Sequence, residues 1–363
     1  MSQAPGTAIW LGDDGNLSQR RFSETYTPTG SDTLVAVKYS GINAADKKHF
    51  LMGLHSFVAG YEFSGLAIAV GPDSPFQLGD AIFGMNRPQH QRPASLGAHQ
   101  DYAIAEAQAF FKIPEGMGLE NAAAMVLVAQ TVLDGILNCL KFGLPSAGVE
   151  GPDPTGQPIL IWGGASGVGV AAIQIAKAAG FGPILTTASP QNHQALCDIG
   201  ATQCFDYKSP TIVADIRSAV EGTGMKLRVI FDAVVGGADP LDPNEQPPFE
   251  ESTPALAKSC CSDQDRPDNL KLTAVLPIVK DPFYKHAMCW RPYDALDFIG
   301  GPQDPQAPVR VRKAMEWLVQ DHGAHWRFPN LTVVQGGTAG IEAMERSAAG
   351  HIRFEKIILE HPI

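Results

Sequence analysis

The order of apolar and polar residues divides the chain into a β-rich beginning, a middle in which strands and helices alternate, and a β-rich end. In the first part, short apolar runs are bounded by turn residues, a pattern typical of strands. These predicted strands cover residues 33–40, 63–70, 80–85 and 100–106. No long helical pattern occurs before about residue 119, so we expect an all-β, barrel-like first domain.

From Leu119 to Gly143 the pattern predicts one or two helices, and a loop rich in Pro and Gly follows at 143–158. Strands and helices then alternate, which predicts right-handed crossovers and a doubly wound parallel sheet. The predicted strands are 182–189, 203–207, 227–235 and 270–279, and the predicted helices are 191–200, 212–220 and 312–321. An acidic, Pro-rich excursion at 238–268 is expected to carry a short helix near 253–261, and strands at 331–337 and 354–360 flank a last helix.

One segment, residues 159–180, reads ILIWGGASGVGVAAIQIAKAAG and predicts a buried strand, a glycine-rich turn and a helix. Glycines in such a turn let a pyrophosphate approach the backbone, and the helix N-terminus offers free N–H groups. The alternative is a tight turn that only packs the helix against the strand. The residues expected to bind the phosphates are Gly163, Gly164, Ala165, Ser166, Gly167, Val168 and Gly169.

Composition narrows the class of protein. The 363 residues carry a net charge of −11, which argues against a general nucleic-acid binder. No run approaches the roughly 18 apolar residues of a membrane span, and the first residues lack the features of a secretory signal. The six cysteines show no C-x-x-C pair and fit reduced thiols, so we expect a cytoplasmic protein with no membrane partner.

Several motifs occur in an order that resembles the medium-chain dehydrogenase/reductase superfamily. They are SGINAADKK (40–48), GYEFSG (60–65), LGD (78–80), KIPEGMGLENAAAM (112–125), GGASGVG (163–169) and GGTAGIEAMERSAAGHIRFEKIIL (336–359). The resemblance implies an α/β protein with a GroES-like β-barrel domain (1–120 and 290–363) and a Rossmann domain with a doubly wound parallel sheet (121–289). The segments ASPQNHQAL, GATQCFDYKSP and INAADKK are most similar to the zinc-independent fungal branch that includes the trans-acting enoyl reductase of lovastatin biosynthesis.

The resemblance also bears on metals. Asn43 falls where zinc-dependent members carry a Cys, and Tyr61 replaces the His that precedes Glu62. An amide and a phenol are poor zinc ligands compared with a thiolate and an imidazole. We therefore expect no metal, and a hydride acceptor that is an activated C=C bond or a quinone.

The expected cofactor is NADPH. Sites specific for NAD place a carboxylate at the end of the second strand, but here Ser189 follows that strand and could donate to a 2′-phosphate. In related enzymes, residues that match Tyr207 and Lys208 contact the adenine and the phosphate, although Lys208 could also be a solvated surface lysine. Asp206 ends the next strand and is expected to point elsewhere. Loops at Val234 and Leu276 are expected to wall the nicotinamide, because ligands bind at the carboxyl ends of strands.

The resemblance places Lys48 and Thr131 in the active site. Either residue could donate to an enolate oxygen, or position the nicotinamide ribose or a proton-relay water. The alternatives are a solvated loop for Lys48 and a hydroxyl bonded to its own helix for Thr131. Asn43 and Asp46 are further candidates for contact with substrate or cofactor, and both residue types also stabilise turns.

Three function classes follow from these residues. The favoured one is an NADPH-dependent trans-acting enoyl reductase whose substrate is an acyl thioester on the acyl carrier protein of a polyketide synthase. The alternative is a stand-alone reductase of free quinones or enones, and a third class is a sensor that only binds the cofactor. The basic residues Arg310, Arg312 and Lys313 are a candidate docking patch for an acidic carrier protein. We expect a monomer or a homodimer.

Overall fold

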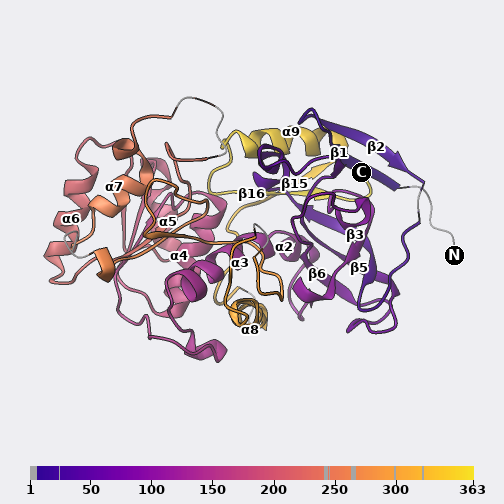
Figure 1. The fold of residues 1–363 in the computed structure, drawn as a ribbon, viewed down its shortest axis with the longest axis horizontal. Coiled ribbons are helices and arrows are strands. Elements are labelled where there is room, and N and C mark those ends of the chain that lie inside the picture. The colour runs from indigo at the N-terminus through magenta and orange to yellow at the C-terminus, as the bar shows by residue number, and fades with distance from the viewer. Residues whose placement is uncertain are drawn as a thin grey trace. The chain divides into compact units, whose positions relative to one another are not determined.

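A parallel sheet and a mostly antiparallel sheet form in separate parts of the chain (Figure 1). The computed structural model describes residues 6–23, 25–240, 244, 246–262, 267–297, 300–320 and 323–363. The chain divides into two compact units, unit 1 (Met1–Leu127 and Arg327–Ile363) and unit 2 (Val128–Trp326). Among the described residues, unit 1 contains two sheets and unit 2 contains one, and each unit has its own buried core.

The sheet of unit 2 has the strand order β11-β10-β9-β12-β13-β14, and every pairing in it is parallel. Its strands are β9 (Ile159–Trp162), β10 (Ile184–Ala188), β11 (Gln203–Asp206), β12 (Val229–Asp232), β13 (Lys271–Ala274) and β14 (Tyr284–His286). From β9 the chain first moves outward to β10 and β11, and then returns to add β12 on the other side. The order therefore reverses beside β9, the place where doubly wound sheets bind ligands. The predicted fold class is confirmed.

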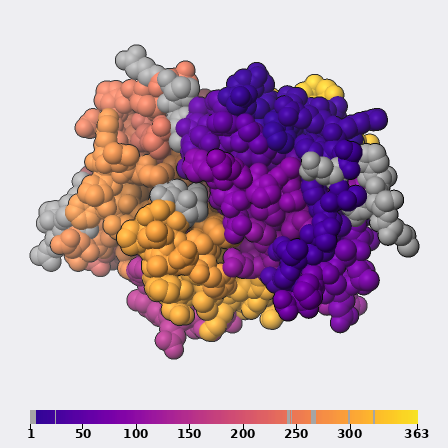
Figure 2. Space-filling model, turned by 45° about the vertical axis from the view of Figure 1, so that its right-hand side comes forward, coloured from indigo at the N-terminus to yellow at the C-terminus, as the bar shows by residue number. Residues whose placement is uncertain are grey.

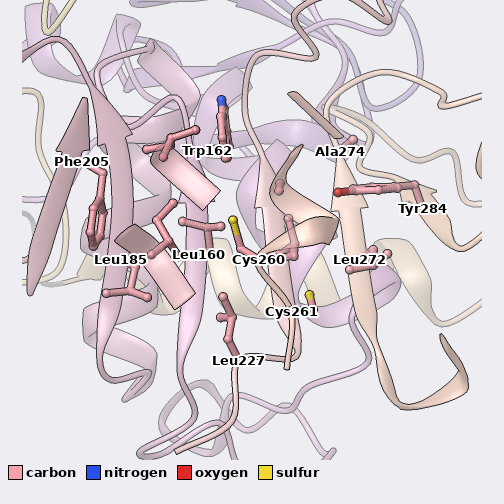
Figure 3. Packing of buried hydrophobic residues seen from close by; sticks show 14 of the residues in the cluster. Leu160, Trp162, Leu185, Phe205, Leu227, Cys260, Cys261, Leu272, Ala274 and Tyr284 are labelled. Atoms are coloured by element: carbon pink, nitrogen blue, oxygen red, sulfur yellow. The ribbon is translucent and has the colours of Figure 1, made fainter. Parts of the chain in front are cut away.

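Successive side chains of each strand point to opposite faces of this sheet. On one face, Leu160, Leu185 and Leu272 belong to a buried cluster that includes Cys260 and Cys261 (Figure 3). The helices α6 (Ile212–Gly222) and α7 (Thr253–Ser259) contribute apolar residues to the same cluster. The remaining helices of unit 2 are α3 (Val126–Asp134, whose first two residues lie in unit 1), α4 (Gly167–Ala179), α5 (His193–Ile199) and α8 (Ala307–Gln320).

The larger sheet of unit 1 has the order β15-β16-β3-β5-β6-β8, with β7 also paired to β3. Its strands are β3 (Thr33–Gly41), β5 (Glu62–Val70), β6 (Ala81–Met85), β7 (Tyr102–Ala105), β8 (Phe110–Lys112), β15 (Leu331–Gln335) and β16 (Lys356–Glu360). Only β15 and β16 pair in parallel. Strand β16 pairs with β3, so both ends of the chain build one sheet, as the resemblance implied.

A second sheet of unit 1, ordered β2-β1-β4, was not predicted. It consists of β1 (Gly6–Leu11), β2 (Leu17–Phe22) and β4 (Phe57–Val58). Most of β2 is polar and its middle is exposed, so it lacks the apolar pattern of a buried strand. Figure 2 shows the indigo N-terminal segment on the surface. The helices of unit 1 are α1 (Ala45–Lys48), α2 (Leu119–Ala123) and α9 (Gly337–Ala348).

The units divide the chain near residues 127 and 326, whereas the sequence predicted boundaries at 120 and 290. The later second boundary has a hydrogen-bonding cause. Asp134 of α3 accepts from the backbone N–H of Met288 at 2.8 Å and binds the Arg291 guanidinium through both carboxylate oxygens. Asn138 donates to the Ala307 carbonyl at 3.1 Å, so these contacts tie the segment to unit 2. None of the helices in the described ranges is long and apolar enough to span a membrane.

Candidate cofactor and catalytic sites

The glycine turn after β9 is shaped by close contacts that exclude side chains. A Cβ atom on Gly164 would lie 2.1 Å from Thr186 Oγ1, and one on Gly169 would lie 2.2 Å from the Gly163 carbonyl oxygen. Gly163 has a φ of +84°, which favours glycine. These glycines therefore allow α4 to approach β9 and β10 closely, whether or not a ligand is present.

The N-terminus of α4 is capped by a side chain, but this cap does not bond all of its N–H groups. Ser166 is the N-cap, and its Oγ accepts from the Gly169 N–H at 3.0 Å while its carbonyl accepts from Val170 at 2.9 Å. The N–H groups of Gly167 and Val168 have no partner among the residues that the structure describes. Together with the positive end of the helix dipole, they can receive a phosphate.

The turn after β12 holds Val234 against the glycine turn. A Cβ on Gly163 would meet Val234 Cγ1 at 2.5 Å, and Val235 has a φ of +50°. The buried Asp232 stabilises this strained turn by accepting from the N–H groups of Val234 (3.0 Å) and Val235 (2.9 Å), and from the Thr253 hydroxyl (2.6 Å). Burial raises the pKa of Asp232 although these hydrogen bonds oppose the shift. Asp232 was not identified from the sequence.

Adenosine is expected to bind at the carboxyl ends of β10 and β11. The residue that directly follows β10 is Ser189, so no carboxylate stands at this position. Asp206 ends β11, and its Oδ1 accepts from the backbone N–H of Lys208 at 3.0 Å. Tyr207 and Lys208 are exposed, with the Lys208 ammonium 5.7 Å from the centre of the Tyr207 ring. Asp206 thus shapes the turn that presents these two side chains.

Two further predicted residues lie in unit 2. Leu276 is partly buried and packs against the core of the parallel sheet. Thr131 lies on α3, where its side chain is 5% exposed, one turn before Asp134. Because Asp134 holds Arg291 and the backbone of Met288, the helix that carries Thr131 is firmly positioned.

In unit 1, Asn43 belongs to a buried polar cluster with Glu62 and Lys356. The Lys356 ammonium donates to Asn43 Oδ1 and to Glu62 Oε1, both at 2.6 Å, and Asn43 Nδ2 donates to the same Glu62 oxygen at 2.8 Å. Glu62 Oε2 accepts from the Leu127 N–H at 2.9 Å. Glu62 is fully buried and Lys356 is 4% exposed, so the two charges neutralise each other away from water.

Asp46 stabilises the loop that carries Asn43. Its Oδ2 accepts from the Asn43 backbone N–H at 2.7 Å, across the turn that leads into α1, and lies 3.2 Å from His99 Nε2. His99 Nδ1 and His361 Nε2 each lie 2.8 Å from the Ser40 hydroxyl, which links them in a buried chain of hydrogen bonds. Burial lowers the pKa of His361 although the nearby carboxylate opposes the shift.

Lys48 ends α1 and is partly exposed. Its neighbour Lys47 forms an ion pair with Glu345 of α9. The roles of Lys48, Thr131, Asn43 and Asp46 in catalysis stay predictions.

The position expected for a zinc-binding His is taken by Tyr61. Its hydroxyl lies 2.7 Å from His49 Nδ1, and its ring lies under the guanidinium of Arg92, 4.4 Å from the ring centre. Glu62, the remaining carboxylate, is bound by an ammonium, which would repel a cation. Across the described ranges, no three His, Cys, Asp or Glu side chains form a group that could hold a metal ion.

The sequence motifs did not predict that Lys356 pairs with Glu62 and Asn43. A single lysine in an apolar strand, KIILE, is the signal that could have found it, because a buried lysine needs a buried acid.

Comparison with known protein families matches two regions of the chain. Residues 29–115 match the model of an alcohol dehydrogenase GroES-like domain, and residues 167–239 match the model of a zinc-binding dehydrogenase. The second match begins at Gly167, the first residue of α4, and extends past β12, so it includes neither most of the glycine turn nor the expected zinc positions.

Curated relatives include fungal proteins named trans-enoyl reductase or dehydrogenase. The chain is 34% identical to trans-enoyl reductase fsa3 of a Fusarium species and 33% identical to trans-enoyl reductase eqxC of Fusarium heterosporum, in each case over 64% of this chain and 65% of the relative. It is 32% identical to dehydrogenase orf1 of Aspergillus niger over 54% of this chain and 59% of that protein. The matched part thus spans less than two thirds of each relative.

Solved structures show the same fold at low identity. An alcohol dehydrogenase superfamily protein from Novosphingobium aromaticivorans superposes with a TM-score of 0.71 at 19% identity, covering 99% of this chain and 100% of that one. The CurK enoyl reductase gives 0.67 at 18% identity, covering 98% and 99%. Mycobacterial Rv1454c, solved with NADPH, gives 0.68 at 19% identity, covering 98% and 100%.

We expect Lys356→Met to lower the free energy of unfolding of unit 1 by about 3 to 5 kcal/mol, because Glu62 would keep a buried charge without its partner. Lys47→Met is the matched control, and its partly exposed pair with Glu345 should contribute about 1 kcal/mol or less. Denaturant titration measures both. Adding Glu62→Gln to Lys356→Met should restore most of the loss, and equal losses in the two lysine variants would contradict the assignment.

Proposed function

The chain belongs to the medium-chain dehydrogenase/reductase superfamily, and we propose that it is an NADPH-dependent, metal-independent enoyl reductase of secondary metabolism. Its substrate is an α,β-unsaturated acyl thioester, and the reaction reduces the C=C bond next to the thioester carbonyl. We assign the enzyme to the trans-acting kind, which works on the acyl carrier protein of a separate polyketide synthase.

The observation that carries this function is the pairing of Glu62 with Lys356 and Asn43. A buried ammonium beside the carboxylate and an amide in place of a thiolate make a poor metal site. An alcohol or ketone would then lack a Lewis acid to polarise it. A C=C bond conjugated to a thioester needs none, because its own carbonyl takes up the charge. The relatives named trans-enoyl reductase favour the same substrate class.

The residues of unit 2 fit a nicotinamide dinucleotide. NADPH, when bound, supplies a hydride for the β-carbon of the substrate. We assign its phosphates to the free N–H groups of Gly167 and Val168, and its 2′-phosphate to Ser189 and Lys208. We assign the adenine to the ring of Tyr207, and the lining of the nicotinamide pocket to Val234 and Leu276. Solved relatives with this fold include one in complex with NADPH.

Lys48 and Thr131 are the proposed donors to the substrate. Hydride addition leaves negative charge on the thioester oxygen, and a positioned N–H or O–H group lowers the energy of that state. Asn43 and Asp46 act as positioning residues, because the hydrogen bond from Asn43 N–H to Asp46 fixes the loop that leads into α1.

The docking of a carrier protein needs cations on the surface of the enzyme. Two of the candidate basic residues, Arg310 and Arg312, form ion pairs with Asp304 and Glu316. Lys313 on the same helix is exposed. The patch is therefore partly neutralised, and Lys313 is its strongest candidate.

The six free cysteines agree with the cytoplasm as the proposed location.

The second candidate function is reduction of free quinones or enones. It uses the same fold, cofactor and hydride step.

A substrate comparison separates the two functions. We expect the enzyme to oxidise NADPH with a short 2-enoyl thioester of N-acetylcysteamine, and faster with the same acyl group on a carrier protein. Absorbance at the NADPH band and the mass of the saturated product measure the reaction. Turnover of quinones alone would refute the proposed function.

Ser189→Asp tests the cofactor. A carboxylate repels the 2′-phosphate and binds the 2′-hydroxyl of NADH, so we expect KM for NADPH to rise by about tenfold or more, equivalent to about 1.4 kcal/mol. Ser189→Ala is the control, because it removes the hydroxyl without adding charge and should raise KM less. An unchanged preference in Ser189→Asp would remove Ser189 from the site.

Lys48→Met and Thr131→Val test the donors. Loss of one donor to a developing oxyanion costs about 10² to 10³ in kcat, so we expect losses of about that size for the residue that donates. KM for NADPH should change little. Lys47→Met, on the same helix, should retain full activity because Lys47 pairs with Glu345. Full activity in both donor variants would exclude these roles.

A further inference from the structure

Two cysteines that are seven residues apart in sequence meet in unit 2. Cys197 lies on α5 and Cys204 on β11, and their sulfur atoms are 3.7 Å apart. The chain turns back between them, because the N–H groups of Gly200 and Ala201 bond to the carbonyls of Cys197 and Leu196 at 3.0 Å. A disulfide of about 2.05 Å would need the sulfur atoms to approach by about 1.7 Å.

The two thiols differ in access to solvent. Cys197 is exposed, whereas Cys204 is half-buried and donates to the His193 carbonyl at 3.5 Å. A reagent from solution therefore meets Cys197 first. By contrast, Cys260 and Cys261 are buried in the core, where no reagent reaches them.

We propose that Cys197 and Cys204 form a redox-active dithiol that reacts with low-molecular-weight disulfides and closes an intramolecular disulfide. The Cys197 thiolate attacks one sulfur of a disulfide such as oxidised glutathione, breaking its S–S bond and releasing one thiol. The Cys204 thiolate then attacks the Cys197 sulfur of the mixed disulfide and releases the second thiol. The protein loses two electrons and two protons, which the two released thiols carry.

The second step needs the thiolate of Cys204. Burial, together with the hydrogen bond and charge of Cys197, raises the pKa of Cys204 to about 12. The contributions of Cys197 end once its sulfur is bound in a mixed disulfide and cannot ionise. Burial, the largest cause, persists, so the pKa of Cys204 stays above its usual value and its attack on the mixed disulfide is the slower of the two steps.

This site lies just before the segment that carries the proposed adenosine contacts. Cys204 pairs in register with Thr186 of β10, and β11 leads directly to Tyr207 and Lys208. The thiol chemistry itself requires no bound cofactor, so it holds or fails independently of the enoyl reductase function.

The test is treatment of the full-length protein with oxidised glutathione, followed by denaturation and alkylation. We expect the number of alkylated cysteines to fall from six to four, with no glutathione retained. Trypsin should release residues 178–208, which contain no internal Lys or Arg, as one unalkylated peptide lighter by two hydrogens. Six alkylated cysteines after treatment, or stable glutathione on Cys197, would overturn the proposal.

Single variants separate the two steps. Cys204→Ser should accumulate a glutathione adduct on Cys197, whereas Cys197→Ser should remain free of both adduct and internal disulfide. Cys289→Ser, outside the pair, should still close the link. Thermal melting of each variant establishes that it is folded, and an internal disulfide at other positions in either single variant would contradict the pairing.

Discussion

The Lys356 ammonium, buried between Glu62 and Asn43, is the interaction on which the proposed chemistry depends. It joins β16 to β5 and to the loop after β3, two neighbouring segments that lie far earlier in the sequence. A buried acid without this partner would be costly, and a metal could serve as the partner only in place of the lysine. The chain thus neutralises Glu62 with its own side chain, and the proposed preference for an activated C=C bond rests on this pairing.

In unit 2, the proposed phosphate site lies at a closely packed turn. The glycines let α4, β9 and β10 approach within distances that no Cβ would tolerate. Val234 covers Gly163, and the strained turn that carries it is held by Asp232 and Thr253. At the N-terminus of α4, two N–H groups have no partner among the described residues, as anion binding requires.

The alternation of strands and helices was sufficient to predict the parallel sheet, because buried parallel strands are continuous apolar runs. The glycine turn was placed correctly between β9 and α4 for the same reason. The strands β1 and β2 were missed, since β2 is polar and partly exposed. The segment 17–22 is a strand because it pairs with β1, and its own sequence pattern does not show this.

Several side-chain contacts could not be predicted from the sequence pattern. Nothing local to Cys197 or Cys204 shows that a turn brings them together. Likewise, the attachment of Arg291 to Asp134 explains why the second unit extends to Trp326, past the predicted boundary. The candidate catalytic residues came from family resemblance, because a single lysine or threonine has no signature of its own.

The most direct test of metal-independent reduction is the rate of NADPH oxidation with a 2-enoyl thioester before and after exhaustive removal of metal ions by a chelator, with metal content measured alongside. The pairing of Lys356 with Glu62 predicts the same rate in both preparations. A rate that falls on chelation and returns with added zinc would contradict the proposed role of this pair.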